Sequence, residues 1–242
     1  DLAKKINDLF KDYPHIITND RLIRGSKKYT GDYKTPEQII PTVKQLDGTD
    51  WETNMTLNDS WGYKKRGCVW KTSETLILNL VDIVSKGGNY LLNIAPDGEG
   101  GIPEINYHRL KEIGNWMKKY GESIYETERV KTSQPMWGRC TQKIVGNKTY
   151  VYLHVIDWPE DQQLLFRLYE KAISAKLLHN GQTLKFKNTH DGIYIDLPKY
   201  APDKYVSVIK VEFDKQLPRF KIRPMNQSNY EIVDADKESQ KK

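Results

Sequence analysis

The sequence predicts a two-part fold, with an α/β segment of the β/α-barrel type followed by an antiparallel β-sandwich. Helical and extended patterns alternate through residues 1–127, which is typical of parallel strands joined by crossover helices. Short strand patterns separated by turn signals fill residues 128–220, as in β-sandwiches. Residues 221–242 are polar and end in DADKESQKK, which predicts a poorly ordered tail.

The first elements lie before residue 60. Apolar side chains at helical spacing predict a helix over residues 2–12, at Leu2, Ile6, Leu9 and Phe10. The segment YPHIITND (13–20) predicts a short buried strand, and residues 24–36, rich in Gly and Lys, predict a loop. Residues 51–58 predict a second strand.

Two helices frame the next strand. Thr72 or Ser73 caps a helix that runs to Lys86, where Gly87 and Gly88 end it. NYLLNIA (89–95) predicts a buried strand, and residues 104–121 predict the following helix, with a turn-rich loop between them.

The second half contains strand patterns of sandwich length at 149–157, 163–170, 175–188, 192–198 and 205–213. Asn180-Gly181 is a hairpin signal within this series.

The composition of the chain excludes several classes of protein. The chain has 242 residues, 38% hydrophobic and 29% charged, and contains no apolar run of the roughly 20 residues that a membrane helix needs. The net charge of +6 raises the question of nucleic acid, but the basic residues are scattered and seldom alternate with aromatic ones. The two cysteines, Cys68 and Cys140, allow one disulfide at most, and the sequence does not decide whether it forms. The five histidines are not spaced as metal ligands. We therefore expect no metal site, no membrane span and no nucleic-acid partner.

Carboxylates follow several of the predicted strands. Hydrolysis of a glycosidic bond uses two of them, one to protonate the leaving oxygen and one to attack the anomeric carbon or activate water. Each also has a structural interpretation. Glu37 follows Pro36 and suits the first turn of a helix, and Glu52 can pair with a Lys or Arg. The residues alone leave the assignment open among Asp20, Asp32, Glu37, Glu52, Asp59, Asp97 and Glu99. Trp51 and Trp61 likewise suit either sugar stacking or packing at the rim of a barrel.

Three stretches carry a resemblance to a known family. They are DWETNMTLNDSWGY (50–63), TLILNLVDIVSKGGNYLLNIAPDGEGGIP (75–103) and LKEIGNWMKKYGESIYET (110–127). Together they resemble the α-L-fucosidases of glycoside hydrolase family 29 over residues 1–127, and the segment behind them matches that family's C-terminal domain in kind. The resemblance implies the C-terminal portion of a (β/α)8-type barrel followed by an antiparallel β-sandwich. It also implies exo-hydrolysis of terminal α-L-fucose from fucosylated glycans, with retention through a covalent fucosyl-enzyme and without metal or organic cofactor.

The resemblance also implies roles for individual residues. Arg21 looks like the arginine that binds sugar hydroxyls, Glu37 like the general acid/base, and Trp61 like the aromatic ring that packs on fucose. Glu52 is the second choice for the acid/base. It opens a strand, where a side chain is tied into the barrel wall, whereas Glu37 lies on a loop that can reach a leaving group.

One motif of the family is missing. Its nucleophilic aspartate lies in a Trp-Phe-Asp-Gly-like motif that these 242 residues do not contain. The resemblance thus implies that the chain is the C-terminal part of an enzyme whose N-terminal half supplies the nucleophile, and that the chain alone is inactive. It implies a periplasmic or secreted location. A non-catalytic carbohydrate-binding module remains the alternative, because aromatic strands without a nucleophile also fit it. Linkage specificity stays open.

Overall fold

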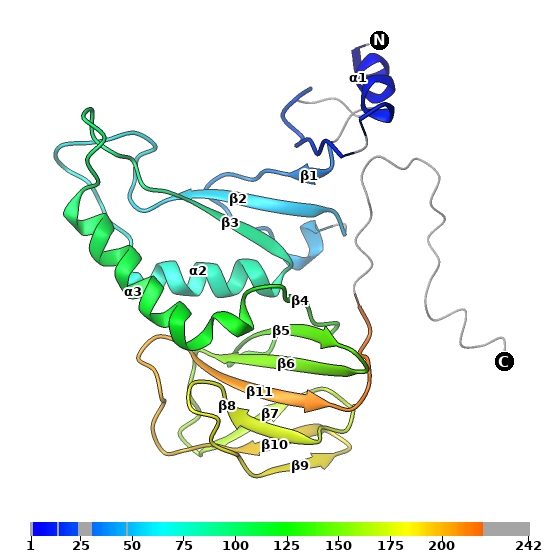
Figure 1. The fold of residues 1–242 in the computed structure, drawn as a ribbon. Helices are drawn as coiled ribbons and strands as arrows, with labels where there is room; N and C mark the ends of the chain where they lie inside the picture. Colours follow the sequence, from blue (N-terminus) through cyan, green and yellow to red (C-terminus); the bar gives the residue numbers. More distant parts are fainter. Residues whose placement is uncertain (1, 14, 24–30, 47, 220–242) are drawn as a thin grey trace.

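The computed structural model describes residues 2–13, 15–23, 31–46 and 48–219. Its elements form three layers, which Figure 1 shows from top to bottom. A parallel sheet lies above two long helices, and an antiparallel sandwich lies beneath them. The helices therefore connect the sheet to the sandwich.

The upper sheet has three parallel strands in the order β1 (Tyr33–Lys34), β2 (Asp50–Thr56) and β3 (Gly88–Asn93). Alternate side chains of β2 are buried, and Trp51 and Met55 pack against Ile83 of helix α2 (Ser73–Ser85). Trp51 also donates a 3.3 Å hydrogen bond to the Lys86 carbonyl. The strand predicted at 51–58 is confirmed, and its apolar side chains face the helix layer.

The predicted helices are confirmed. Helix α1 spans Leu2–Lys11 and helix α3 spans Glu104–Tyr120. The structure also contains two 3₁₀ turns that the sequence did not predict, η1 (Val43–Gln45) and η2 (Gly121–Ser123). The cap of α2 is Thr72, whose hydroxyl accepts a 3.1 Å hydrogen bond from the Thr75 N–H. This bond satisfies one of the amide groups that a helix start leaves without an intrahelical partner.

Two expectations about buried strands are corrected. Of the predicted strand at 13–20, the described residues 13 and 15–18 form no strand, and Ile16 and Ile17 are exposed. Among these described residues, Asn19 alone forms a bridge, to Tyr33. The pairing near Asn19 is too short to order the preceding isoleucines as a strand. The strand predicted at 89–95 exists as β3, but it is half-buried, with Leu91 48% exposed. Within the described residues β3 pairs only with β2, so its other edge is uncovered.

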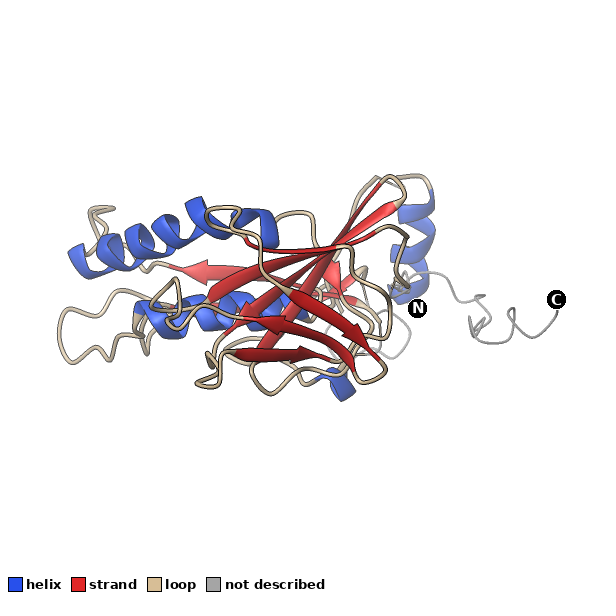
Figure 2. Ribbon diagram, turned by 90° about the horizontal axis from the view of Figure 1, so that it is seen from below, coloured by secondary structure: helices blue, strands red, loops and turns tan. Residues whose placement is uncertain are grey.

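The lower part of the molecule is the predicted antiparallel sandwich. One sheet has the order β4 (Glu128–Arg129), β5 (Gly138–Val145), β6 (Lys148–Val155), β11 (Ser207–Phe213) and β8 (Ser174–Leu177). The other has the order β7 (Gln163–Phe166), β10 (Gly192–Asp196) and β9 (Phe186–Thr189). Val151 and Val211 of the first sheet share one core with Phe166 and Ile193 of the second, and Figure 2 shows the strands from below. The two faces therefore pack against each other.

The Asn180-Gly181 turn is present, but it joins different sheets. Gly181 has a φ of +73°, and the Leu177 N–H donates to the Gln182 carbonyl at 2.9 Å. Only Lys176 and Thr183 form a bridge across the turn. The Leu184 N–H also donates to the Ala175 carbonyl at 2.9 Å, so the hairpin expected over 175–188 is present at residues 175–184. The chain then crosses to the second sheet and forms β9, so the expected pairing is wrong for residues 186–188.

An aromatic cluster fixes the helices to the sandwich. Trp116 and Tyr120 of α3 pack with Val81 of α2 and with Tyr152 and Val208 of the sandwich. The Trp116 indole donates a 2.9 Å hydrogen bond to the Val206 carbonyl. A continuous apolar contact of this kind holds the two parts in one arrangement. The boundaries at 127/128 and 220/221 stay predictions, and the predicted tail lies outside the described residues.

Gly138 tests how tightly the first sheet of the sandwich is packed. A Cβ at this position would overlap the His154 carbonyl oxygen of the neighbouring strand. We expect Gly138→Ala to lower the free energy of unfolding by about 1–3 kcal/mol, measured by urea denaturation. Gly98→Ala is the matched control, because a Cβ there meets nothing within 4 Å. Equal stabilities of the two variants would contradict the close approach.

Candidate active site

The side of the upper sheet that faces away from α2 is polar. Trp51, Thr53 and Met55 are buried, and the alternation of a strand turns Glu52 and Asn54 to the opposite face. The register of β2 with β3 places Asn89 beside Glu52 and Leu91 beside Asn54. These side chains are half-buried or exposed. Such a face can hold a polar ligand that also has an apolar edge.

Glu37 joins the same face. The segment around it runs parallel to β2, with the Gln38 N–H donating to the Asn54 carbonyl at 2.9 Å and the Asn54 N–H donating to the Pro36 carbonyl at 3.1 Å. A bridge pairs Glu37 directly with Asn54. Glu37 is thus extended rather than in the first turn of a helix, so the capping interpretation of Pro36 and Glu37 is wrong.

The register also relates the two candidate glutamates. Glu52 precedes Asn54 by two residues on the same face, so its Cα lies roughly 8 Å from that of Glu37, given strand spacings of about 4.8 Å and 3.3 Å per residue. Both therefore lie on the same face of the sheet. Glu37 lies closer to the carboxyl end of the strands, where β/α folds place their chemistry.

Arg21 holds Glu37 in place. Its Nη2 lies 2.7 Å from Glu37 Oε1, and both side chains are 44% exposed. The same guanidinium donates to Thr35, from Nε to Oγ1 at 2.7 Å and from Nη2 to the carbonyl at 2.8 Å. The Thr35 hydroxyl in turn donates to Asp20 Oδ1 at 2.5 Å. This relay orients the arginine and brings together two of the residues that the sequence singled out.

Trp61 lies apart from this pair, in the loop between β2 and α2. Its side chain is 40% exposed, and within the described residues it takes part in none of the contacts between aromatic rings. Trp51, by contrast, is buried in the core. Of its two predicted roles, sugar stacking and packing, the structure therefore supports packing. The indole of Trp61 is accessible to a ligand.

Sequence reasoning missed three polar residues of this end of the sheet. Asn54 and Asn93 each hold a buried amide oxygen that has no hydrogen-bond partner among the described residues, a costly state that a ligand hydroxyl would relieve. Lys71 donates from Nζ to the Thr56 carbonyl at 2.6 Å and to the Asn58 carbonyl at 3.2 Å, and burial lowers the pKa of its amine. Asn93 interrupts an apolar run, which is a usable signal, but nothing in the sequence marks Lys71.

The structure answers several questions about other groups. Asp59 and Asp97 serve loop geometry: Asp97 accepts hydrogen bonds from the Glu99 and Gly101 N–H groups at 3.0 and 2.7 Å. Cys68 and Cys140 are free thiols and do not pair. In the part of the chain that the structure describes, no group of three or more His, Cys, Asp or Glu is arranged to hold a metal ion. None of the described helices is long and apolar enough to cross a membrane.

Comparison with known proteins identifies the family of the chain. Residues 1–122 match the family model for alpha-L-fucosidase, and residues 132–212 match the model for the alpha-L-fucosidase C-terminal domain. The plasma alpha-L-fucosidase of Homo sapiens is 34% identical over 198 residues, covering 76% of this chain and 41% of the relative. The alpha-L-fucosidase of Dictyostelium discoideum is 31% identical, covering 81% of this chain and 44% of the relative.

Solved structures give the same result. Alpha-L-fucosidase isoenzyme 1 from Paenibacillus thiaminolyticus superposes with a TM-score of 0.74 at 32% identity, over 86% of this chain and 53% of its own. A family 29 alpha-L-fucosidase from Bacteroides thetaiotaomicron, solved as a trapped covalent intermediate, gives 0.74 at 26% identity, over 86% and 52%. The chain spans less than half the length of the curated relatives it matches. It belongs to the alpha-L-fucosidase family.

Proposed function

We propose that this chain is part of an exo-acting, retaining α-L-fucosidase that releases terminal L-fucose from fucosylated oligosaccharides or glycoconjugates. The observation that carries the proposal is the Arg21–Glu37 pair at the carboxyl end of a polar sheet face, in a chain of the fucosidase family. A glycosidase needs a carboxyl group that can protonate a leaving oxygen, and a half-exposed glutamate at this edge can do so.

Glu37 is the general acid/base in this proposal. It lies nearer the carboxyl end of the strands than Glu52, and Arg21 fixes the direction of its side chain. Arg21 Nη1 is used by none of the hydrogen bonds that hold this guanidinium to Thr35 and Glu37, so it is the donor that we assign to a sugar hydroxyl. Trp61 supplies an accessible ring for the apolar edge of fucose. Glu52 supports the wall of the site.

The reaction proceeds in two steps through a covalent fucosyl-enzyme. In the first step Glu37 protonates the leaving oxygen while a second carboxylate attacks the anomeric carbon. In the second step Glu37 removes a proton from a water molecule, whose oxygen attacks the anomeric carbon and releases the second carboxylate together with fucose. The Bacteroides relative, trapped as a covalent intermediate, supports this route. No metal or organic cofactor takes part.

The nucleophile lies outside these 242 residues in this proposal. The sequence has no Trp-Phe-Asp-Gly-like motif, and the chain covers 41% of the human plasma relative. The uncovered edge of β3 and the half-exposed Leu91 suit further strands that complete a (β/α)8-type barrel. We therefore propose the N-terminal half of the same enzyme as the partner that carries the nucleophile. The family resemblance favours a periplasmic or secreted location.

The whole polypeptide tests the proposal. It should hydrolyse an aryl α-L-fucoside, and proton NMR taken early in the reaction should show α-L-fucose before mutarotation mixes the anomers. Early β-L-fucose would contradict retention. A whole polypeptide that binds fucosides without cleaving them would support the non-catalytic carbohydrate-binding module instead.

A further inference from the structure

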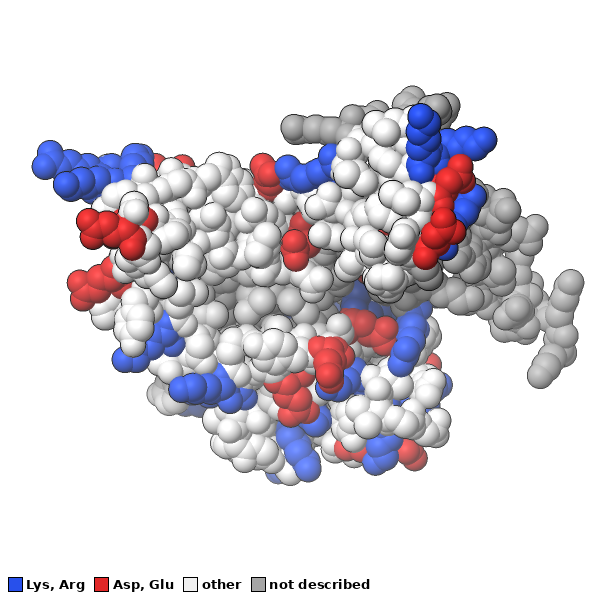
Figure 3. Space-filling view, turned by 45° about the horizontal axis from the view of Figure 1, so that its top comes forward, with Lys and Arg blue, Asp and Glu red and all other residues white. Residues whose placement is uncertain are grey.

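A pocket of about 320 Å³ lies where β2 and β3 lead into their loops. Most of its wall belongs to the segment between β2 and α2, which we call the basic loop (residues 59–70), and Ala95 and Pro103 close the other side. The loop after β2 and the loop after β3 extend together from one end of the molecule (Figure 1). Lys and Arg side chains project from that end in the space-filling view (Figure 3). The carboxyl ends of parallel strands share one edge, so the pocket opens on the same edge as Glu37.

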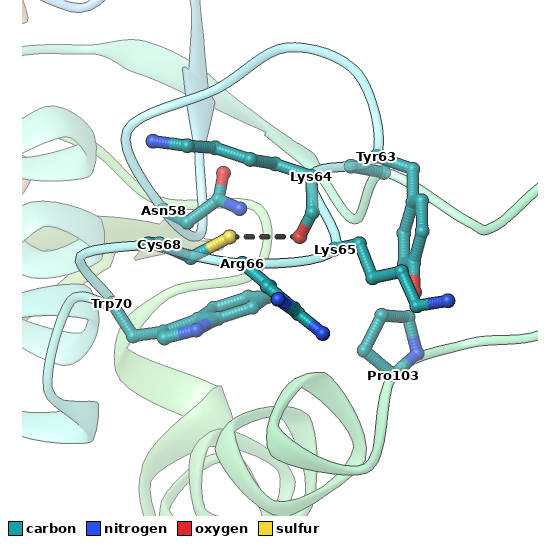
Figure 4. A pocket seen from close by; sticks show the side chains of 10 residues that line it. Asn58, Tyr63, Lys64, Lys65, Arg66, Cys68, Trp70 and Pro103 are labelled. Carbon is teal, nitrogen blue, oxygen red and sulfur yellow. Dashed lines mark hydrogen bonds between the residues drawn. The ribbon is translucent and has the colours of Figure 1, made fainter.

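The pocket carries positive charge that its own wall does not neutralise. Lys64, Lys65 and Arg66 line it in succession, and none of the described residues in its lining is acidic. The Nζ of Lys64 pairs with Asp59 Oδ2 at 2.9 Å. Within the described residues Lys65 and Arg66 form no ion pair. Figure 4 shows the Arg66 guanidinium between Trp70 and Pro103, and the Lys65 side chain beside Tyr63 and Pro103. Two cations in a concave wall attract an anion.

The basic loop is held in shape before any ligand arrives. Asp59 clamps its ends, because one carboxylate oxygen takes Lys64 while the other accepts a 3.3 Å hydrogen bond from the Val69 N–H. The Cys68 thiol donates to the Lys64 carbonyl at 3.0 Å, the dashed contact in Figure 4. Gly67 takes a φ of +68° at the turn between them. A wall already ordered loses little conformational freedom on binding.

Aromatic rings flank the two cations. Trp70 and Tyr63 line the pocket, and flat rings pack against the C–H face of a sugar. The planar guanidinium of Arg66 can bind two oxygens of an oxyanion at once, and Lys65 adds a point charge. We propose that this pocket receives an oxyanion-bearing sugar, a sulfate ester or a uronate, on the leaving-group side of the fucoside. The inference rests on the proposed function and adds a substrate class to it.

The test compares three α-L-fucosyl disaccharides in the whole enzyme, with galactose, 6-sulfated galactose or galacturonate as the second sugar. We expect a higher kcat/KM for at least one charged substrate than for the neutral one. The double variant Lys65→Gln/Arg66→Gln should reduce that ratio by about tenfold, the effect of losing a hydrogen bond to a charged group, and leave the neutral substrate unchanged. The two charged substrates distinguish sulfate from carboxylate. Lys185→Gln/Lys187→Gln is the matched control, since both lysines are exposed on the far sheet of the sandwich.

A binding measurement separates this inference from the proposed function. Methyl galactoside 6-sulfate and methyl galacturonide are titrated calorimetrically against the whole enzyme and both double variants. Binding of either probe that is lost in Lys65→Gln/Arg66→Gln alone supports the pocket even if no substrate is cleaved, a result that would overturn only the fucosidase proposal. Cleavage of the neutral substrate without preference for charge and without probe binding overturns the pocket. Equal losses in the two double variants overturn it as well.

Discussion

Replacement of Glu37 by Gly in the whole enzyme should lower kcat/KM for natural fucosides by about 10²- to 10⁴-fold, the usual contribution of a positioned general acid. The loss should be much smaller for aryl fucosides with good leaving groups, because they need little protonation. Azide should restore turnover, since it attacks the fucosyl-enzyme without the help of a base. Steady-state kinetics on both substrate types, with and without azide, measure all three effects.

Glu52→Gly is the matched comparison. Glu52 lies on the same sheet face as Glu37, but two residues before Asn54, which is the bridge partner of Glu37, and so further from the carboxyl end of the strands. It should slow both substrate types to a similar extent, and azide should not rescue it. The reverse pattern, with Glu37→Gly fully active on natural fucosides and Glu52→Gly rescued by azide, would assign the acid to Glu52 and overturn our choice.

The free energy of unfolding should decrease as the pH falls below 7, because of one buried histidine. His154 is fully buried in β6, where its Nε2 lies 3.2 Å from the Thr141 hydroxyl and its Nδ1 has no hydrogen-bond partner within the described part of the chain. Desolvation lowers the pKa of its imidazole to about 3. The unfolded chain keeps a histidine pKa of about 6.5, so between these values it binds a proton that the folded state does not. Stability contributed by neutral His154 is therefore present above about pH 6.5 and is lost as the pH falls toward 3. We expect a decrease of about 2 kcal/mol from pH 7 to pH 5 in urea denaturation.

Two variants isolate that decrease. His154→Gln should remove most of it, whereas His190→Gln should not, because the His190 side chain is 91% exposed. If His154→Gln does not fold, NMR of the unmodified protein decides, since the His154 ring signals should not titrate above about pH 5. A His154 that titrates near pH 6.5 in the folded protein would show that burial does not lower its pKa. Protonation of carboxylates belongs to a lower pH range and does not obscure this window.

Much of the fold could be predicted from periodicity. Helix α2 has a cap at Thr72, apolar side chains at helical spacing and two glycines after it, so local signals agree about its bounds. Strand β2 follows from its alternation. Strand β5 is missed, because its sequence GRCTQKIV lacks apolar alternation and because Thr141 and Gln142 are polar residues buried within it. Their burial depends on strands and loops distant in sequence, which no local pattern contains.

In the candidate active site, too, the sequence identifies individual residues but does not predict how they contact each other. Arg21 and Glu37 are identified through the family resemblance, and the structure brings them within 2.7 Å through Thr35 and a bridge to Asn54. That contact depends on the register of two parallel segments, which residues alone do not specify.

The basic loop shows what local sequence leaves out. From the sequence alone, the Lys64-Lys65 pair indicates a solvated face. Its pocket arises only because Trp70 and Pro103, which are separated in the sequence by α2, β3 and the loop after it, line the same space.

The configuration of the azide product from Glu37→Gly decides whether Glu37 is the general acid/base of a retaining fucosidase. If Glu37 is the acid/base of a retaining fucosidase, azide attacks the β-linked fucosyl-enzyme on the face that Glu37 has vacated, and the product is α-L-fucosyl azide. Proton NMR of the isolated product distinguishes the two anomers. Formation of β-L-fucosyl azide would show that Glu37→Gly has removed the nucleophile instead, and formation of neither azide would show that Glu37 is not a catalytic carboxylate.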